Sequence, residues 1–243
     1  MTTVEPGVVD VAPGVRRVLA PNPGHMTLDG TNTYLVEADN GVVVVDPGPL
    51  LEEHLATVAS YGPVLAAVLT HGHSDHAGGI DRFVELTGAE VLDRAALPED
   101  GAEIGLAGLR VFHTPGHTAD SISLVRGDVL FSGDTILGRG TTVVAYPDGN
   151  LTDYLASLPR LRDLGHLTVL PGHGPVLPSA QEAASYYLDH RTVRLEQVRA
   201  AVAAGDTTAD QVVRRVYADV DPILWPAAEL SVRAQLAHLE RAT

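Results

Sequence analysis

The sequence predicts an α/β fold built from packed layers, followed by a small helical domain. Short apolar segments, many rich in β-branched residues, alternate with helical segments over residues 1–178, and this alternation is typical of layered α/β proteins. The strand-like segments stop near Pro178, and residues 179–243 show helical patterns instead. The chain has 243 residues, 45% of them hydrophobic and 19% charged, so it can bury a sizeable core.

Eight strands are expected in the first domain, residues 1–178, because each segment is apolar and bounded by turn residues. They are Val15–Leu19, Thr33–Glu37, Gly41–Val45, Val64–Leu69, Leu109–His113, Ile122–Val125, Val129–Phe131 and Leu167–Leu170. Three helices are expected between them, at Leu50–Tyr61, Gly78–Thr87 and Leu151–Asp163.

Three helices are also expected in the second domain, residues 179–243. The first is indicated by apolar side chains at helical spacing on one face, which are Tyr187, Leu188, Leu195, Val198 and Val202. The second begins with a capping-box pattern from Thr208 to Gln211. The third is indicated by Pro226, because proline is common in the first turn of a helix.

The charge and the missing residue types exclude several classes of protein. The chain has 31 acidic and 16 basic residues, all of the latter Arg, and a net charge of −15. This charge disfavours binding of extended duplex nucleic acid, because phosphate binding needs a positive local potential. The absence of Cys excludes disulfide frameworks and thiolate nucleophiles. Neither a signal peptide nor a membrane-spanning segment is recognisable, so we expect a cytoplasmic protein without membrane partners.

The strongest functional signal is a His-rich motif directly after the expected strand Val64–Leu69. The sequence T-H-G-H-S-D-H-A-G-G begins at residue 70 and contains four potential metal ligands, which are His71, His73, Asp75 and His76. Imidazole and carboxylate groups suit Zn, Fe and similar metals. A catalytic zinc ion takes three protein ligands and a structural one takes four. Because further candidates follow along the chain, we expect the ligands to be shared between two ions.

Three more potential ligands follow other expected strands. His117 lies in T-P-G-H-T, Asp134 in S-G-D-T and His173 in P-G-H-G-P. Loops at the carboxyl ends of strands are where ligands collect in α/β folds, so we expect these residues to join the motif. The remaining histidines are interpreted as structural or surface residues. They are His25, His54, His113, His166, His190 and His238. Among them, His25 is the candidate to test for a position near the site.

In this order, the seven candidates resemble the metal-binding motif of the metallo-β-lactamase superfamily over about residues 22–178. The resemblance implies a four-layer αββα sandwich and two Zn²⁺ per chain, with Fe or Mn as alternatives. It assigns one ion to His71, His73 and His117, the other to Asp75, His76 and His173, and Asp134 to both. Asp46 resembles the family's aspartate at a strand end, and we expect it to orient a ligand histidine.

The expected chemistry follows from such a site. Two divalent ions about 3.5–4 Å apart can share a water and lower its pKa to about 7, which gives a metal-bound hydroxide at neutral pH. Asp75 is expected to act both as a ligand and as the acceptor of the water's proton. We therefore predict a zinc-dependent hydrolase that needs no Ser or Cys nucleophile.

Two segments, 22–35 and 133–142, resemble the lactamase-β-like protein 2 subgroup. The helical tail is similar to that subgroup's winged-helix-like domain, with too few residues for a full wing. The characterised eukaryotic member is an endoribonuclease, so the resemblance implies phosphodiester hydrolysis in single-stranded RNA. Arg139, near the site, is a candidate to bind a phosphate.

Two alternatives remain open. One is a thioester hydrolase resembling glyoxalase II, which uses the same seven ligands; the Gly174-Pro175 pair and the absence of Lys from the tail count against it. The other is a non-catalytic metal-binding module. The expected partner is a small-molecule or single-stranded nucleic-acid substrate, and the sequence leaves the oligomeric state open.

Overall fold

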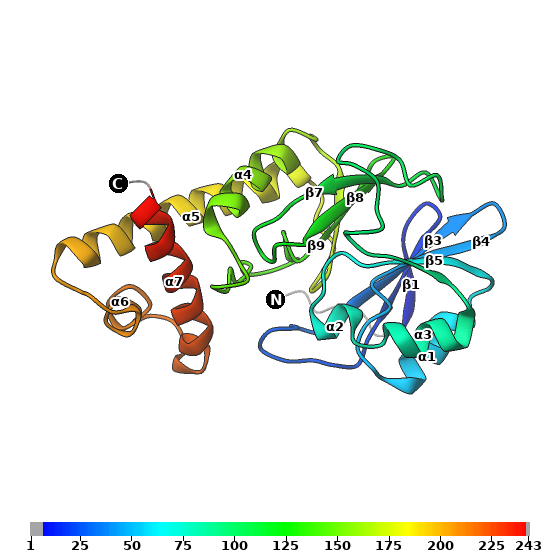
Figure 1. The fold of residues 1–243 in the computed structure, drawn as a ribbon, viewed down its shortest axis with the longest axis horizontal. Helices are drawn as coiled ribbons and strands as arrows, with labels where there is room; N and C mark the ends of the chain where they lie inside the picture. The colour runs from blue at the N-terminus through cyan, green and yellow to red at the C-terminus, as the bar shows by residue number, and fades with distance from the viewer. Residues whose placement is uncertain (1–6, 242–243) are drawn as a thin grey trace.

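Two β-sheets lie between two layers of helices in the computed structural model of the chain, which describes residues 7–241 (Figure 1). The first sheet has the strand order β1-β2-β3-β4-β5-β6. Its strands are Val8–Ala12, Val15–Leu19, Asn32–Ala38, Gly41–Val45, Val64–Val68 and Glu90–Leu92. Neighbours from β1 to β4 are antiparallel, whereas β4, β5 and β6 are parallel.

The second sheet has the order β10-β9-β8-β7. Its strands in chain order from β7 to β10 are Arg110–His113, Ile122–Arg126, Val129–Gly133 and Thr168–Pro171. Only β9 and β10 run parallel among these described pairs. The helices from α1 to α4 are Glu52–Ala59, Ser74–Ala77, Ile80–Thr87 and Leu151–Arg162.

The side chains of β4 explain the layered packing. Four consecutive valines are buried on both faces of the strand, as expected for a strand covered on both sides. Val43 and Val45 face the second sheet, in the core that contains Phe131. Val42 and Val44 face the opposite way, in the core under α1 and α3. The outer face of the second sheet packs against α4 and α5, so the four-layer αββα arrangement is confirmed.

The C-terminal part consists of α5 (Ala180–Ala203), α6 (Ala209–Val216), a short 3₁₀ helix (Pro222–Leu224) and α7 (Trp225–Arg241). The long helix α5 runs from the second sheet to the helical end of the molecule (Figure 1). Its first half shares a core with α4, and its second half shares another with α6 and α7. Residues 179–241 contain no β-strand, in agreement with a reduced wing.

The structure differs from the expected elements at three places. The short strands β1 and β6 are additional, and most of their side chains are only partly buried, which leaves little apolar signal. The second half of the His-rich motif forms the one-turn helix α2 rather than a loop. Val202 is 43% exposed, because the buried face of α5 continues through Val198 and Ala201.

Within residues 7–241, no helix has both the length and the apolar character needed to cross a membrane.

Candidate metal centre

All seven sequence-predicted donors come together at one edge of the sandwich. The loop after β5 and the helix α2 supply the first four donors, and the loops or strand ends after β7, β9 and β10 supply one each. Three groups have ligand atoms within 4.8 Å of one another. They are His71–His73–His117, His71–His76–Asp134 and Asp75–His76–His173.

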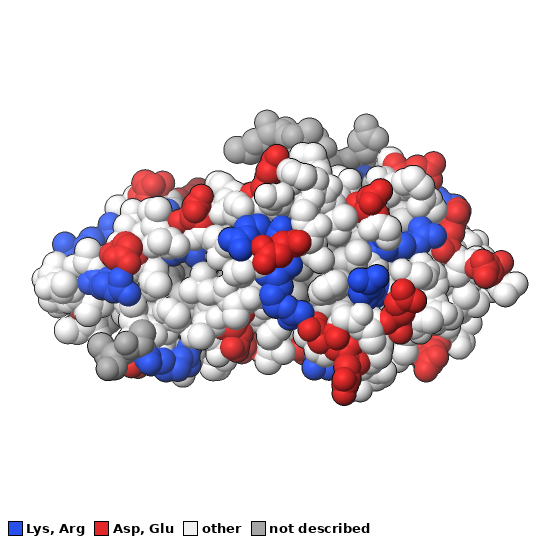
Figure 2. Space-filling view, turned by 90° about the horizontal axis from the view of Figure 1, so that it is seen from above, with Lys and Arg blue, Asp and Glu red and all other residues white. Residues whose placement is uncertain are grey.

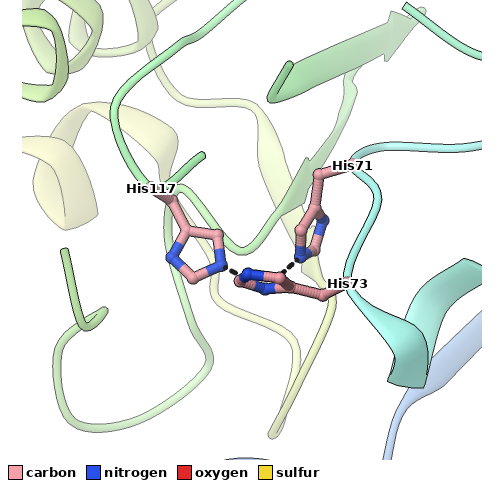
Figure 3. Close-up of side chains that lie close together, drawn as sticks. All are labelled: His71, His73 and His117. Atoms are coloured by element: carbon pink, nitrogen blue, oxygen red, sulfur yellow. Dashed lines mark hydrogen bonds between the residues drawn. The ribbon is translucent and has the colours of Figure 1, made fainter. Parts of the chain in front are cut away.

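The first group consists of three imidazole rings from two separate loops (Figure 3). His73 Nδ1 lies 3.1 Å from His71 Nε2 and 3.1 Å from His117 Nε2. The three ring nitrogens therefore point to a common position, as the close-up shows.

The group Asp75–His76–His173 combines two imidazoles with a carboxylate. His76 Nε2 and His173 Nε2 are 3.2 Å apart, and Asp75 Oδ2 lies 3.0 Å from His173 Nε2. Asp134 lies between this group and the group His71–His73–His117. Its carboxylate oxygens are 3.4 Å from His76 Nε2 and 3.7 Å from His117 Nε2. This position is the one expected of a bridging carboxylate.

The outward-facing nitrogens determine which ring atoms are free for a metal. His117 Nδ1 lies 2.8 Å from the Val143 carbonyl, and His173 Nδ1 lies 3.0 Å from the Gly30 carbonyl. A carbonyl only accepts, so each Nδ1 carries the proton and donates it. The lone pair of each neutral ring is then on Nε2, which faces the cluster.

His73 has the opposite orientation. Its Nδ1 faces the cluster, and its Nε2 lies 3.8 Å from Asp148 Oδ2 near the protein surface. The two other rings of its group are buried, whereas the His73 side chain is 42% exposed. His73 therefore lies on the solvent side of the cluster.

Asp46 supports the site from beneath, as the sequence suggested. Its Oδ2 lies 2.8 Å from His76 Nδ1, and its carboxylate also accepts hydrogen bonds from Thr70 N and Thr70 Oγ1, both at 2.7 Å. Thr70 Oγ1 in turn lies 3.1 Å from His71 Nδ1. Because Thr70 donates its hydroxyl proton to Asp46, it accepts from His71, and one carboxylate thus orients two histidines.

Close backbone approach also shapes the site. The β10–α5 loop passes so near to Asp134 that a Cβ at Gly172 would overlap Asp134 Oδ1 and lie 2.7 Å from His76 Cε1. The side chain of Asn32, at the start of β3, binds the carbonyls of Pro171 and Gly174 at 2.9 Å each. These contacts fix the loop that carries His173 against the first sheet.

Burial and charge divide the imidazoles into two kinds. Burial lowers the pKa of His71 and of His117, so both rings are neutral at physiological pH. Burial also opposes protonation of His173, but Asp134 and Asp75 outweigh it and raise its pKa to about 9. Burial raises the pKa of Asp134, yet His173 and His76 outweigh burial and hold it well below its usual range. The carboxylates of the centre therefore stabilise positive charge placed beside them.

The residues present fit a pair of divalent cations. Ring nitrogens of His71, His73 and His117 converge within 3.1 Å of His73 Nδ1, and Asp134 Oδ1 is buried with no hydrogen-bond partner in the described part of the chain. A buried carboxylate oxygen without a partner is costly, and a cation satisfies it. Nitrogen and oxygen donors are the set that hydrolytic zinc pairs use.

A cavity of about 320 Å³ opens beside the centre, between the sandwich and the helical tail. His117 and Asp134 lie in its wall, as does the sequence-predicted candidate His25. The cavity surface is more apolar than polar, and its apolar residues are Met26, Leu28, Leu137, Val143, Val220, Leu224, Ala227 and Ala228. Arg139, the candidate for phosphate binding, also lines it, and both of its terminal nitrogens bind Asp29 at 2.8–2.9 Å.

The sequence did not indicate the contribution of α5 to this cavity. His190, Arg191 and Arg194 line it, although they lie far from the metal motifs in the sequence. A pair of basic residues three positions apart on a helix was the available signal, but their proximity to the site depends on how α5 packs.

Comparison with known proteins agrees with the fold. The sequence profile of the Metallo-beta-lactamase superfamily matches residues 26–93 and 89–173, and that of the Beta-lactamase associated winged helix domain matches residues 208–242. A Beta-lactamase-like protein 2 homolog from Caenorhabditis elegans is 37% identical over 90% of this chain and 81% of its own length. An atrochrysone carboxyl ACP thioesterase from Aspergillus chevalieri is 34% identical over 88% of this chain and 77% of its own length.

Two solved structures extend the comparison. A beta-lactamase domain protein from Burkholderia ambifaria superposes with a TM-score of 0.85 at 25% identity, over 98% of this chain and 90% of its own. A di-iron-bound form of TTHA1623 has a TM-score of 0.57 at 30% identity, over 69% of this chain and 96% of its own.

Proposed function

Since the chain belongs to the metallo-β-lactamase superfamily of hydrolases, we propose that it uses two divalent metal ions to hydrolyse thioesters of apolar acyl groups. The observation that carries the substrate class is the cavity beside His117 and Asp134, whose wall is mostly apolar. Apolar pockets with a few polar groups at one end suit ligands with an apolar body and a reactive polar group. The thioesterase named among the relatives supports the same class.

The proposed ligand sets are those implied by the family resemblance, with His71, His73 and His117 on one ion and Asp75, His76 and His173 on the other. Asp134 lies between them and is shared. Zinc is the expected metal, and iron is the main alternative because a relative has been solved in a di-iron form. When bound, the two cations supply Lewis-acid activation of the carbonyl and a nucleophilic water near neutral pH.

The chain's own groups perform the remaining tasks. Asp75 is the proposed proton acceptor, because its carboxylate is partly exposed at the cluster and its Oδ2 lies 3.0 Å from His173 Nε2. Burial raises the pKa of Asp75, but its hydrogen bond to His173 and the neighbouring His76 outweigh burial and lower it. The carboxylate is therefore ionised at neutral pH and can take a proton. The apolar cavity wall holds the acyl group and excludes water from it.

Single-stranded RNA is the second candidate, and the sequence resemblance ranked it first. The observations in its favour are the relatedness to Beta-lactamase-like protein 2 homologs and the three arginines in the cavity wall. A single-stranded binding groove combines a cationic track with stacking aromatic rings. Tyr217 is the one Phe, Tyr or Trp side chain among the described lining residues, and acidic and basic side chains are interspersed on the face in Figure 2. The single aromatic residue and the mixed surface charge therefore favour a thioester substrate over single-stranded RNA.

The test is a comparison of two substrate classes with metal-reconstituted protein. We expect hydrolysis of an octanoyl thioester of N-acetylcysteamine to exceed cleavage of a single-stranded oligoribonucleotide. Asp134→Ala and a chelator should each abolish the reaction. Metal-dependent RNA cleavage without thioester hydrolysis would reverse the ranking, and no turnover of either substrate would refute the proposed function.

A further inference from the structure

Arg191 and Arg194 form an unusual pair in the wall of the cavity. They lie three residues apart on α5, so their side chains project from the same side of the helix. Arg191 is 6% exposed, and arginine is almost never buried this deeply without a charged partner. Both residues line the cavity that contains His117 and Asp134.

Neither guanidinium has a carboxylate partner in the described part of the chain. Arg191 donates to the Thr142 carbonyl and lies over the ring of Tyr154, 5.1 Å from its centroid. Its Nε is buried and has no hydrogen-bond partner. Arg194 donates to the Val216 carbonyl at 2.7 Å and lies over the ring of Tyr217. These partners are neutral, so they leave both positive charges uncompensated.

Several other arginines of this acidic chain are neutralised by carboxylates. Arg82, Arg160 and Arg215 each form ion pairs with carboxylates, and the chain has 31 acidic residues against 16 basic ones. Keeping a buried cation without a counter-charge is unfavourable. The neighbouring His190 is affected by the same positive charges, because burial and the two arginines lower its pKa to about 4.

The pair is also connected to the metal centre. Arg191 binds the Thr142 carbonyl, and the next carbonyl, that of Val143, accepts from His117 Nδ1 at 2.8 Å. The Thr142 hydroxyl donates to the backbone carbonyl of Asp134 at 2.7 Å. The guanidiniums and the metal centre also line one cavity of about 320 Å³, so a single ligand in that cavity can contact both.

We propose that Arg191 and Arg194 form an anion-binding subsite that recognises an acidic group, carboxylate or phosphate, on the substrate. The proposal rests on the proposed function for the bond that is cleaved, and it narrows the substrate to an acyl thioester with a negative charge remote from the reacting carbonyl. A carboxylate would belong to the acyl group, and a phosphate to the thiol carrier. The guanidinium fork matches either group with two parallel hydrogen bonds.

Two matched substrate pairs distinguish the sources. The first pair is glutaryl- and pentanoyl-N-acetylcysteamine, which differ in a terminal carboxylate. The second is butanoyl-phosphopantetheine and butanoyl-pantetheine, which differ in a phosphate. We expect the wild-type protein to prefer the charged member of one pair by about tenfold or more in kcat/KM. The pair that shows the preference identifies the source of the anion.

Arg191→Gln and Arg194→Gln should lose this preference while still hydrolysing the neutral member, and Arg191→Lys should keep part of it. Arg199→Gln is the matched control, because Arg199 is an exposed residue of the same helix that pairs with Glu196. If Arg191 only supports the fold, its replacement lowers turnover of both members equally and leaves their ratio unchanged, and that result overturns the proposal. Should Arg191→Gln not fold, Arg194→Gln and Arg191→Lys provide the same comparison.

A binding measurement separates this inference from the proposed function. Calorimetric titration of the metal-reconstituted protein with glutarate and with phosphopantetheine needs no turnover. Binding of one of them by the wild type that weakens about tenfold in Arg194→Gln supports the subsite even if no thioester is hydrolysed. Thioester hydrolysis with equal rates within both pairs, and anion affinities unchanged in the arginine variants, overturns the subsite and leaves the proposed function standing.

Discussion

Replacement of Asp46 should show how far this residue contributes to metal affinity and how far it contributes to the stability of the fold. Asp46 is 2% exposed and accepts hydrogen bonds from Thr70 N, Thr70 Oγ1 and His76 Nδ1. Asp46→Ala leaves three buried donors unpaired at about 1–3 kcal/mol each, so the loss is on the order of 3–9 kcal/mol. Because a whole domain is stable by only about 5–15 kcal/mol, this variant should fold poorly.

Asp46→Asn is the informative variant. Asp46 has φ +52°, and Asn tolerates this left-handed conformation as Asp does. The amide oxygen can still accept from Thr70 N, but the NH₂ group then faces His76 Nδ1. His76 must turn Nδ1 into an acceptor, which moves its proton to Nε2, the atom that faces Asp75 and His173.

The expected loss is about tenfold to hundredfold in metal affinity, the range typical for residues that orient a ligand histidine. This corresponds to about 1.4–2.8 kcal/mol. Zinc affinity is measured by chelator competition, and the free energy of unfolding of the metal-free variant by chemical denaturation. Asp128→Asn, at an exposed position, controls for the lost charge. A metal affinity of Asp46→Asn within about twofold of the wild type would refute the reasoning.

Three further variants test other parts of the structure. Gly172→Ala places a methyl group against Asp134 Oδ1, so we expect metal content to fall with little change in circular dichroism; two ions per chain would contradict this. Burial lowers the pKa of His54 below 6.5, so the unfolded chain binds the proton more readily. The contribution of neutral His54 is present above pH 6.5 and is lost as the pH falls through the lower folded-state pKa. His54→Gln should therefore lose less unfolding free energy than the wild type between about pH 7.5 and 5.5, and an equal loss would show that His54 is not involved. Thr208→Ala removes the capping box of α6 and should lower the unfolding free energy by about 1 kcal/mol; an unchanged denaturation midpoint would contradict that role.

The clustering of the seven candidate donors was predictable from the sequence because they lie next to strongly patterned strands. The run Val64–Val68 is apolar and mostly buried, so its end is recognisable, and His71 follows three residues after it. The expectation for Asp46 came from the family resemblance, and its position directly after the buried strand β4 agrees with it. In each case local pattern and tertiary position coincide.

The features that the sequence did not reveal depend on packing between distant segments. Arg191 reaches the cavity because α5 packs against α4 and against the loop that contains Thr142. The helical spacing predicted Val202 on the buried face of α5. The first half of α5 packs against α4 and its second half against α6 and α7, so the buried face is not the same along the whole helix. Neither the cavity nor the order of preference between thioester and RNA follows from spacing alone.

The most direct test of the account is the metal content of the purified protein. Inductively coupled plasma mass spectrometry of protein expressed with supplied zinc and then dialysed should find about two divalent ions per chain. The double variant His73→Ala with Asp134→Ala should retain fewer than one, because it removes a donor from one group and the carboxylate between the groups. A folded wild-type protein that contains no divalent metal, and takes none up from added zinc or iron, would contradict the central claim.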